Sequence, residues 1–300
     1  MKKIIECVPN FSEGARKDVI DDIVSAVSEA KGAQVLDISS DPDHNRSVLT
    51  MVGDEQGLKD AILILFEKAI EHIDLTKHKG EHPRMGAVDV VPFVPIKGVT
   101  MDDCVALSKE IGELVANKFD IPVYLYEESA SSPERESLPK IRKGQFEGFF
   151  EKIKQPEWKP DFGPQEVHPT AGVVAIGARM FLIAYNVYLS TDNVEIADKI
   201  AKAIRHISGG LRYVKALGMM IEERKLTQVS INLVDYQKTP IYRVFELIRA
   251  EARRYGVHIV DSEIVGMVPS EALIDTAQYY LQLAGFSSSQ VLENKLAETE

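Results

Sequence analysis

The chain has 300 residues, of which 45% are hydrophobic and 27% are charged, and its formal net charge at pH 7 is −11. This length predicts about two domains with ordinary hydrophobic cores, and the composition excludes a disordered protein. The acidic balance disfavours nucleic acids and anionic membranes as partners, because basic surfaces bind both. We therefore expect small-molecule ligands.

Targeting and redox signals are weak throughout the chain. No apolar run approaches the ~18 residues that a membrane span requires, and the N-terminus lacks the pattern of a secretory signal, so we expect a cytoplasmic protein. The two cysteines, Cys7 and Cys104, have no paired spacing. This argues against a disulfide framework and against a cysteine-based zinc or redox site.

Hydrophobic periodicity in the first half predicts alternating strands and helices. The expected order is strand 4–8, helix 19–27, strands 34–38 and 47–52, helix 58–73, strand 88–94, helix 102–119 and strand 123–126. Four prolines between residues 155 and 170 then leave little room for regular structure. We place a linker there, with subdomains 1–170 and 171–300.

The second half repeats the same order of elements. It is expected to contain one or two strands within 173–189, helix 194–204, strands 214–221 and 228–233, helix 241–252, strand 257–267 and helix 270–284. Each half resembles a split βαβ unit, so the predicted class is α/β (α+β). We expect two subdomains of the ferredoxin-like type, each a mixed sheet with helices on one face.

A basic segment, residues 77–86, interrupts this acidic chain between a long helix and a buried strand. Its glycine and proline favour an exposed loop around His82. A solvated turn is the simplest alternative. Metal binding by His78 and His82 would require helical spacing, which Gly80 and Pro83 disfavour.

Two further polar segments join predicted elements. Residues 37–47 form a connection rich in turn-forming residues that also carries three carboxylates, an imidazole and a guanidinium. Residues 7–14 lead from a strand toward a helix, and we expect Ser12 to cap that helix. Taken alone, each segment also suits an ordinary turn.

Three segments together resemble the signature sequences of the formiminotransferase family. The matching stretches are ECVPNFSEG (6–14), HNRSVLT (44–50) and GEHPRMGAVDVVPF (80–93). Residues 160–164 and 177–186 resemble the same family, so the similarity covers nearly the whole chain. It implies two α/β subdomains with a substrate tunnel between them.

The resemblance implies transfer of a formimino group from N-formimino-L-glutamate to tetrahydrofolate, a step of histidine degradation and one-carbon metabolism. The histidine matching His82 is the family's catalytic acid/base. The stretch that matches residues 163–172 lies at the family's folate site, so we expect folate contacts from Gly163, Pro164, His168, Pro169, Thr170, Ala171 and Gly172. We further expect a homodimer. A separate downstream cyclodeaminase is also expected, because the chain ends at Glu300 without room for that second activity.

A carboxylate would stabilise the cationic amidine during transfer. Fused family members carry an acidic residue where Ser39 stands here, so the choice among nearby carboxylates stays open. In order, the candidates are Asp41, Glu81 and Asp89.

Both substrates carry carboxylates, which guanidinium groups bind through paired hydrogen bonds. We therefore expect Arg46 and Arg84 to bind substrate, each with a surface ion pair as the alternative. Asn10, in the first matching segment, is also expected at the substrate. No metal is expected.

Other functions compete with this interpretation. A metal-dependent amidohydrolase could use His44, His78, His82 and Asp41, and chelation of the metal would reveal it. A regulatory ligand-binding module would explain the fold but would leave the His82 loop without a purpose. Within the transferases, formiminoglycine or formylglutamate could be the donor.

Overall fold

The computed structural model describes residues 3–297. The chain divides into two compact units, one up to Met180 and one from Phe181 onward. Within residues 3–297, no helix is both long enough and apolar enough to cross a membrane. Each unit is described by itself below.

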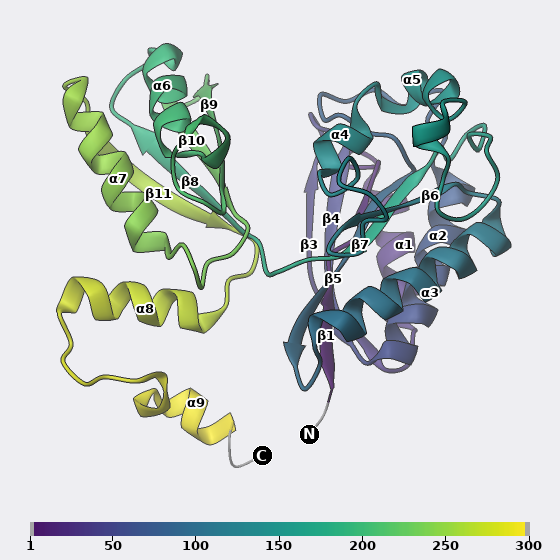
Figure 1. The fold of residues 1–300 in the computed structure, drawn as a ribbon, viewed down its shortest axis with the longest axis horizontal. Helices are drawn as coiled ribbons and strands as arrows, with labels where there is room; N and C mark the ends of the chain where they lie inside the picture. The colour runs from purple at the N-terminus through teal and green to yellow at the C-terminus, as the bar shows by residue number, and fades with distance from the viewer. Residues whose placement is uncertain (1–2, 298–300) are drawn as a thin grey trace. The chain divides into compact units, whose positions relative to one another are not determined.

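The first unit is built on a seven-stranded mixed sheet (Figure 1). Neighbouring strands follow the order β1-β4-β2-β5-β7-β6, with β3 paired to the outer side of β4 and β1 also paired to β5. Pairing is parallel between β5 and β7 and between β7 and β6, and antiparallel elsewhere. The strands are β1 (Ile4–Cys7), β2 (Asn10–Phe11), β3 (Ala33–Asp41), β4 (Arg46–Gly53), β5 (Val88–Lys97), β6 (Val123–Glu127) and β7 (Val174–Ala178).

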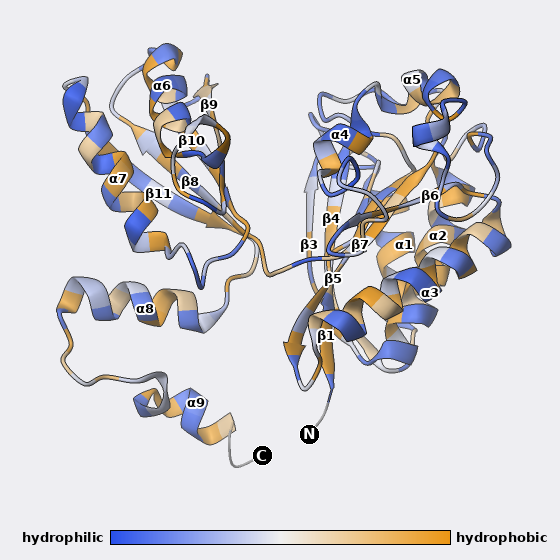
Figure 2. Cartoon of the chain, viewed as in Figure 1, coloured by the Kyte–Doolittle hydropathy of each residue, from blue (hydrophilic) through white to orange (hydrophobic). Residues whose placement is uncertain are grey.

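Three amphipathic helices cover one face of this sheet: α1 (Lys17–Ser28), α2 (Glu55–His72) and α3 (Met101–Phe119) (Figure 1). Their apolar stripes pack on the central strands, which are among the most hydrophobic segments of the unit (Figure 2). Two shorter helices, α4 (Leu138–Arg142) and α5 (Gln145–Lys152), follow β6, and a 3-10 turn spans Pro156–Trp158. The opposite face of the sheet carries polar residues of the candidate active site.

The second unit is a four-stranded antiparallel sheet in the order β11-β8-β10-β9. Its helices α6 and α7 bury their apolar stripes in one core with the sheet. The order strand, helix, strand, strand, helix, strand is that of a split βαβ unit. Its elements are β8 (Ile183–Leu189), α6 (Val194–Ile204), β9 (Val214–Ile221), β10 (Leu226–Leu233), α7 (Ile241–Arg254), β11 (Ile259–Val265), α8 (Ser270–Leu281) and α9 (Leu292–Ala297), with 3-10 turns at His206–Ser208 and Ser288–Gln290.

The same topology underlies the first unit, where β3, β4, β1 and β5 form the split βαβ core and β7 and β6 extend it. The predicted fold class is therefore confirmed. The expectation of a mixed sheet is correct for the first unit only, because all pairings in the second are antiparallel.

The apolar run at 173–189 forms two strands in different units. Residues 174–178 form β7, which pairs in parallel with β5 and β6 and belongs to the first sheet. Residues 183–189 form β8 of the second sheet. Consequently the division falls at Met180, whereas the proline-rich stretch had placed it near residue 170.

Candidate active site

The first unit brings the three polar segments of the sequence together. Asn45 links them, because its side chain accepts a hydrogen bond from the Gly14 N–H (2.9 Å) and donates one to the Lys79 carbonyl (2.8 Å). The Glu81 N–H also donates to the Asp43 carbonyl at 3.1 Å. Segments 7–14, 37–47 and 77–86 therefore form one loop cluster at the end of the sheet.

Gly80 permits a close approach between the His82 loop and segment 37–47. A Cβ atom at that position would lie 2.4 Å from the carbonyl oxygen of His44 and 2.8 Å from the Cβ of Asn45. No real side chain tolerates such contacts with backbone, so a larger residue would push the His82 loop away from β4. The glycine is required by packing rather than by an unusual φ angle.

His82 has one ring nitrogen engaged and one available. Its Nδ1 atom lies 2.7 Å from the Pro83 carbonyl oxygen and 3.1 Å from Nη1 of Arg46. A carbonyl only accepts hydrogen bonds, so we assign the ring proton to Nδ1. Nε2 then carries the free lone pair, and no group within residues 3–297 hydrogen-bonds to it.

A buried charge network lies beside this imidazole. Asp89 accepts hydrogen bonds from Arg46 Nη1 (3.1 Å) and Arg142 Nη2 (2.6 Å) through Oδ2, and from the Met85 N–H (2.8 Å) through Oδ1. The other terminal nitrogen of Arg46 donates to Oδ1 of Asn10. Two guanidinium groups thus share one carboxylate, which leaves one net positive charge next to His82.

This charge balance sets the protonation of the site. Burial lowers the pKa of His82 to about 4, and the positive charges of Arg46 and Arg142 act in the same direction. Burial alone would raise the pKa of Asp89, but the two guanidinium groups hold it below its usual range. At neutral pH the imidazole is therefore neutral and the carboxyl group is ionised.

Arg84 lies in the same loop but has different partners. Its guanidinium group forms two hydrogen bonds with Glu147 of α5 (2.9 and 2.6 Å), one with Nδ1 of His78 and one with Gln145 (both 3.3 Å). Only 9% of the residue is exposed. These contacts fasten the His82 loop to α5, so a substrate contact by Arg84 stays a prediction.

The predicted helper carboxylates lie around the cluster. Asp41 holds the Nδ1 atom of His44 at 2.8 Å, and the His44 ring approaches the ring of His82 edge-on, with centroids 6.2 Å apart. Glu81 is exposed, and no side-chain hydrogen bond joins it to the charge network within the described chain. Ser39 pairs with Val48 on β4, two residues from Arg46 on the same side of the strand.

Asp41 is the strand partner of Arg46, yet within residues 3–297 Arg46 forms an ion pair with Asp89 (3.1 Å) and none with Asp41 or Glu81. Ser12 does not cap a helix, because α1 begins only at Lys17; its hydroxyl instead donates to the Gly86 carbonyl at 2.8 Å. In that position Ser12 fixes segment 7–14 against the strand that carries Asp89.

The predicted folate segment, residues 163–172, is an irregular and tightly fixed stretch. His168 Nδ1 accepts hydrogen bonds from the N–H groups of Ala171 (2.9 Å) and Thr170 (3.4 Å), and burial lowers the pKa of this histidine. Gly172 has φ +73°, and a Cβ there would lie 2.1 Å from the Met85 carbonyl. The segment therefore packs against the His82 loop at Met85. Folate contacts by its residues stay a prediction.

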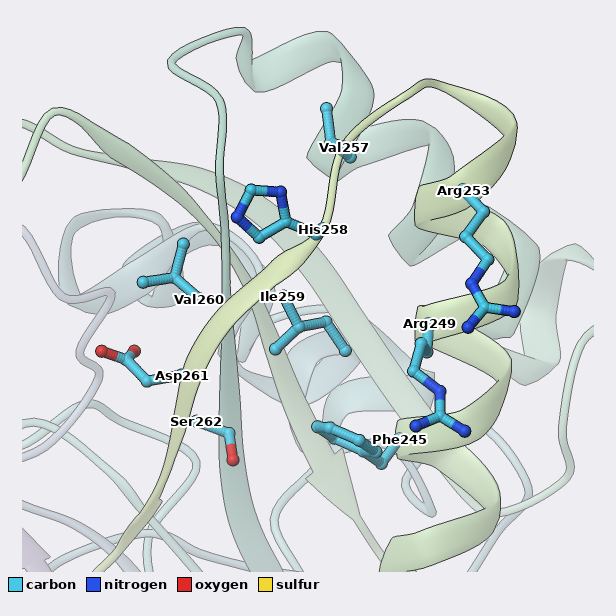
Figure 3. A pocket seen from close by; sticks show the side chains of 9 residues that line it. All are labelled: Phe245, Arg249, Arg253, Val257, His258, Ile259, Val260, Asp261 and Ser262. Atoms are coloured by element: carbon cyan, nitrogen blue, oxygen red, sulfur yellow. The ribbon is translucent and has the colours of Figure 1, made fainter.

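Two pockets lie outside the charge network. One, of about 460 Å³, is lined by Glu13, Arg16, His72 and His78, among others. The second, of about 350 Å³, lies between α7 and β11 in the second unit, where Arg249 and Arg253 extend from the helix (Figure 3). Neither adjoins the Asp89 carboxylate.

The described residues contain no group of three or more histidine, cysteine, aspartate or glutamate side chains placed to hold a metal ion. His78, one ligand of the proposed hydrolase site, uses both ring nitrogens elsewhere. Its Nε2 donates to the Asn45 carbonyl (2.9 Å), and its Nδ1 accepts from Arg84. His78 is thus part of the loop scaffold.

Arg142 is the site residue that sequence reasoning missed. It ends α4, a helix of five residues, and reaches Asp89 from 53 positions away in the chain. Its Nε atom is buried and has no hydrogen-bond partner among residues 3–297. The only signal in the sequence was an isolated arginine among lysines, which could not be distinguished from surface charge.

Two family models together match nearly the whole chain. Residues 4–179 match the model of the formiminotransferase domain, N-terminal subdomain, and residues 184–296 match that of the formiminotransferase domain. The chain belongs to the formiminotransferase family.

Several similar proteins have names that include formimidoyltransferase. A glutamate formimidoyltransferase of Streptococcus pyogenes serotype M1 is 54% identical, over 99% of each chain. One from Thermoplasma acidophilum is 50% identical, over 98% of this chain and 97% of the relative. The formimidoyltransferase-cyclodeaminase of Mus musculus is 44% identical over 93% of this chain, which matches 53% of that longer protein.

Proposed function

We propose that the chain transfers the formimino group of N-formimino-L-glutamate to tetrahydrofolate, giving 5-formiminotetrahydrofolate and L-glutamate. Family membership and two relatives named glutamate formimidoyltransferase support this reaction. The observation that carries it in the structure is the neutral His82, whose Nε2 is free beside two guanidinium groups.

The transfer requires one proton to be moved. The N5 amine of tetrahydrofolate attacks the amidine carbon, the new N5–C bond forms, and the bond from that carbon to the glutamate nitrogen breaks. We propose that Nε2 of His82 takes the N5 proton and returns it to the departing nitrogen. The protonated ring would lie near Arg46 and Arg142, which makes it a strong acid toward the leaving group.

The guanidinium groups suit the substrate carboxylates. Arg46 and Arg142 carry two positive charges against the single carboxylate of Asp89, and Nε of Arg142 is a buried donor without a partner in the described part of the chain. A substrate carboxylate would accept that hydrogen bond and balance the charge. We infer that these two arginines bind the donor, with Asn10 orienting Arg46 and Arg84 positioning the loop.

Tetrahydrofolate needs a binding site next to His82. We propose that residues 163–172 bind tetrahydrofolate, since they adjoin the His82 loop through Met85. A cytoplasmic location, a homodimer and a separate cyclodeaminase that consumes the product are predictions from the sequence. Gel filtration with light scattering tests the dimer, and release of ammonia alongside glutamate would contradict the separate cyclodeaminase.

A donor panel tests the proposed reaction. The purified protein would be incubated with tetrahydrofolate and, in turn, formiminoglutamate, formiminoglycine and formylglutamate, with and without a chelator. We expect rapid formation of 5-formiminotetrahydrofolate from formiminoglutamate only, unaffected by the chelator. Preference for another donor would change the substrate assignment, and loss of activity with chelator would favour the metal-dependent hydrolase.

A further inference from the structure

Glu6 on β1 is a buried acid that the proposed reaction does not use. Only 5% of the residue is exposed, and within residues 3–297 its carboxyl group forms neither a hydrogen bond nor an ion pair. Burial raises the pKa of its carboxyl group to about 7, against the opposing charge of Arg179. Burial makes the charged form of this carboxyl group costly, and a ligand that donates hydrogen bonds to it would stabilise that form.

Strand pairing places Glu6 on the same face of the sheet as the charge network. Glu6 lies opposite Val52 of β4 and Val94 of β5, strands that flank β1 in the sheet (Figure 1). Side chains alternate along a strand, so Arg46, six positions before Val52, projects to this same face. Asn10, which pairs with Val48, does so too.

Arg179 provides a second polar group beside Glu6. Its N–H donates to the Phe93 carbonyl (3.0 Å), which extends β7 alongside β5. The guanidinium donates to the Met180 carbonyl (3.0 Å) and hydrogen-bonds to the buried Tyr126. Its charge acts on Glu6, yet the two side chains form no ion pair. A hydrogen-bond acceptor on β1 and a donor that follows β7 therefore lie on either side of β5 without forming an ion pair.

This pair matches one chemical pattern in particular. A 2-amino-4-oxopyrimidine presents an exocyclic amino group, a ring N–H and a carbonyl oxygen in a row along one edge. A carboxylate accepts the first two as parallel hydrogen bonds, and a guanidinium donates to the third. The amidinium of the formimino group also offers two N–H donors to a carboxylate, but it has no acceptor for Arg179.

We propose that Glu6 and Arg179 form the subsite for the 2-amino-4-oxo edge of the pterin ring. The inference rests on the proposed function, in which tetrahydrofolate is the acceptor. Glu6 and Asn10 are four positions apart, about 13 Å along extended backbone at ~3.3 Å per residue. The ring edge would thus be held away from His82, with N5 directed toward it.

The test compares tetrahydrofolate with its 2-desamino-2-methyl analogue on the wild-type protein and on Glu6→Gln. Binding is measured by calorimetry without donor, and KM is measured for each substrate. Glu113→Gln, an exposed position of α3 on the other face of the sheet, is the matched control. Thermal unfolding establishes that each variant is folded, and removal of a buried carboxylate is not expected to lower its stability.

We expect wild type to bind tetrahydrofolate at least about 10-fold more tightly than the analogue, as the loss of a charge-assisted hydrogen bond requires. Glu6→Gln should remove most of that difference and leave the KM for formiminoglutamate within about two-fold. Equal binding of both folates by wild type would overturn the inference without touching the proposed reaction. A rise in KM for formiminoglutamate alone would assign Glu6 to the amidinium instead and also overturn it, whereas a wild-type protein without any transferase activity would refute the proposed function itself.

Discussion

Arg46 and His82 are 36 positions apart in the chain, yet Nη1 of the arginine lies 3.1 Å from Nδ1 of the histidine. The same Nη1 donates to the buried Asp89, so the arginine is fixed before any substrate arrives. The positive charge of Arg46 disfavours a second proton on the His82 ring, so its Nε2 remains available as a base. Arg46, on β4, thereby influences the protonation of His82 in the neighbouring loop.

Arg142 is predicted to bind the donor carboxylate. Arg142→Lys keeps a positive charge but loses the planar fork that reaches Asp89 and the free Nε donor. We expect the KM for formiminoglutamate to rise about 10-fold or more, in line with loss of a charge-assisted hydrogen bond, with a smaller change for tetrahydrofolate. Steady-state kinetics measure both KM values, with Lys140→Gln, an exposed position on the same helix, as the control. Unchanged KM values in Arg142→Lys would show that Arg142 does not bind substrate.

Variants of Arg84 and Glu147 test whether Arg84 contacts substrate or only holds the His82 loop in place. If Arg84 only fastens the His82 loop to α5, then Glu147→Gln should reproduce the kinetic defect of Arg84→Lys, because either change breaks the same paired hydrogen bonds. The double variant should then be no worse than either single variant. A large KM effect confined to Arg84→Lys would instead support direct contact with substrate.

The stability of the protein should fall in mild acid partly because of His82. Its pKa in the folded chain is about 4, below the value near 6.5 of an exposed imidazole. Between these values the unfolded chain binds a proton that the native chain does not, so native stability is lost as pH falls from about 6.5 to 4. His82→Gln should lose less stability over this window than wild type, measured by urea unfolding, with the exposed His206→Gln as control; parallel curves would contradict the lowered pKa.

The fold was largely predictable because it depends on local patterns. The stripes of α2 and α3 and the apolar strand at residues 88–94 each carry their own periodicity, and their order identifies a split βαβ unit. The two strands within 173–189 could not be assigned to separate sheets, since hydrophobicity alone does not specify pairing partners.

The site was predictable only in part. His82 and Arg46 lie in segments with an unusual density of polar residues, and the family resemblance drew attention to them. Arg142 and the role of Asp89 depend on a contact between a short helix and a strand 53 positions apart, which no local pattern encodes. Glu6 looked like an ordinary strand residue, and only its burial marks it.

Residues 163–172 are predicted to become protected when folate binds. The turn around His168 is held by hydrogen bonds from the Thr170 and Ala171 N–H groups to the histidine ring, so we expect these N–H groups to exchange only when the turn opens. Saturating tetrahydrofolate should slow hydrogen exchange in residues 163–172. Helix α7 of the second unit serves as the internal reference. Identical exchange with and without ligand would place the folate elsewhere.

The central claim is that the neutral imidazole of His82 carries the proton during transfer. It is tested most directly by a single-turnover measurement with formiminoglutamate and tetrahydrofolate, comparing wild type with His82→Gln. We predict that the rate of glutamate formation falls by ~10²-fold or more while the Kd for tetrahydrofolate stays within a few-fold, because proton transfer is lost and binding is not. A His82→Gln protein that forms glutamate at the wild-type rate would contradict the account.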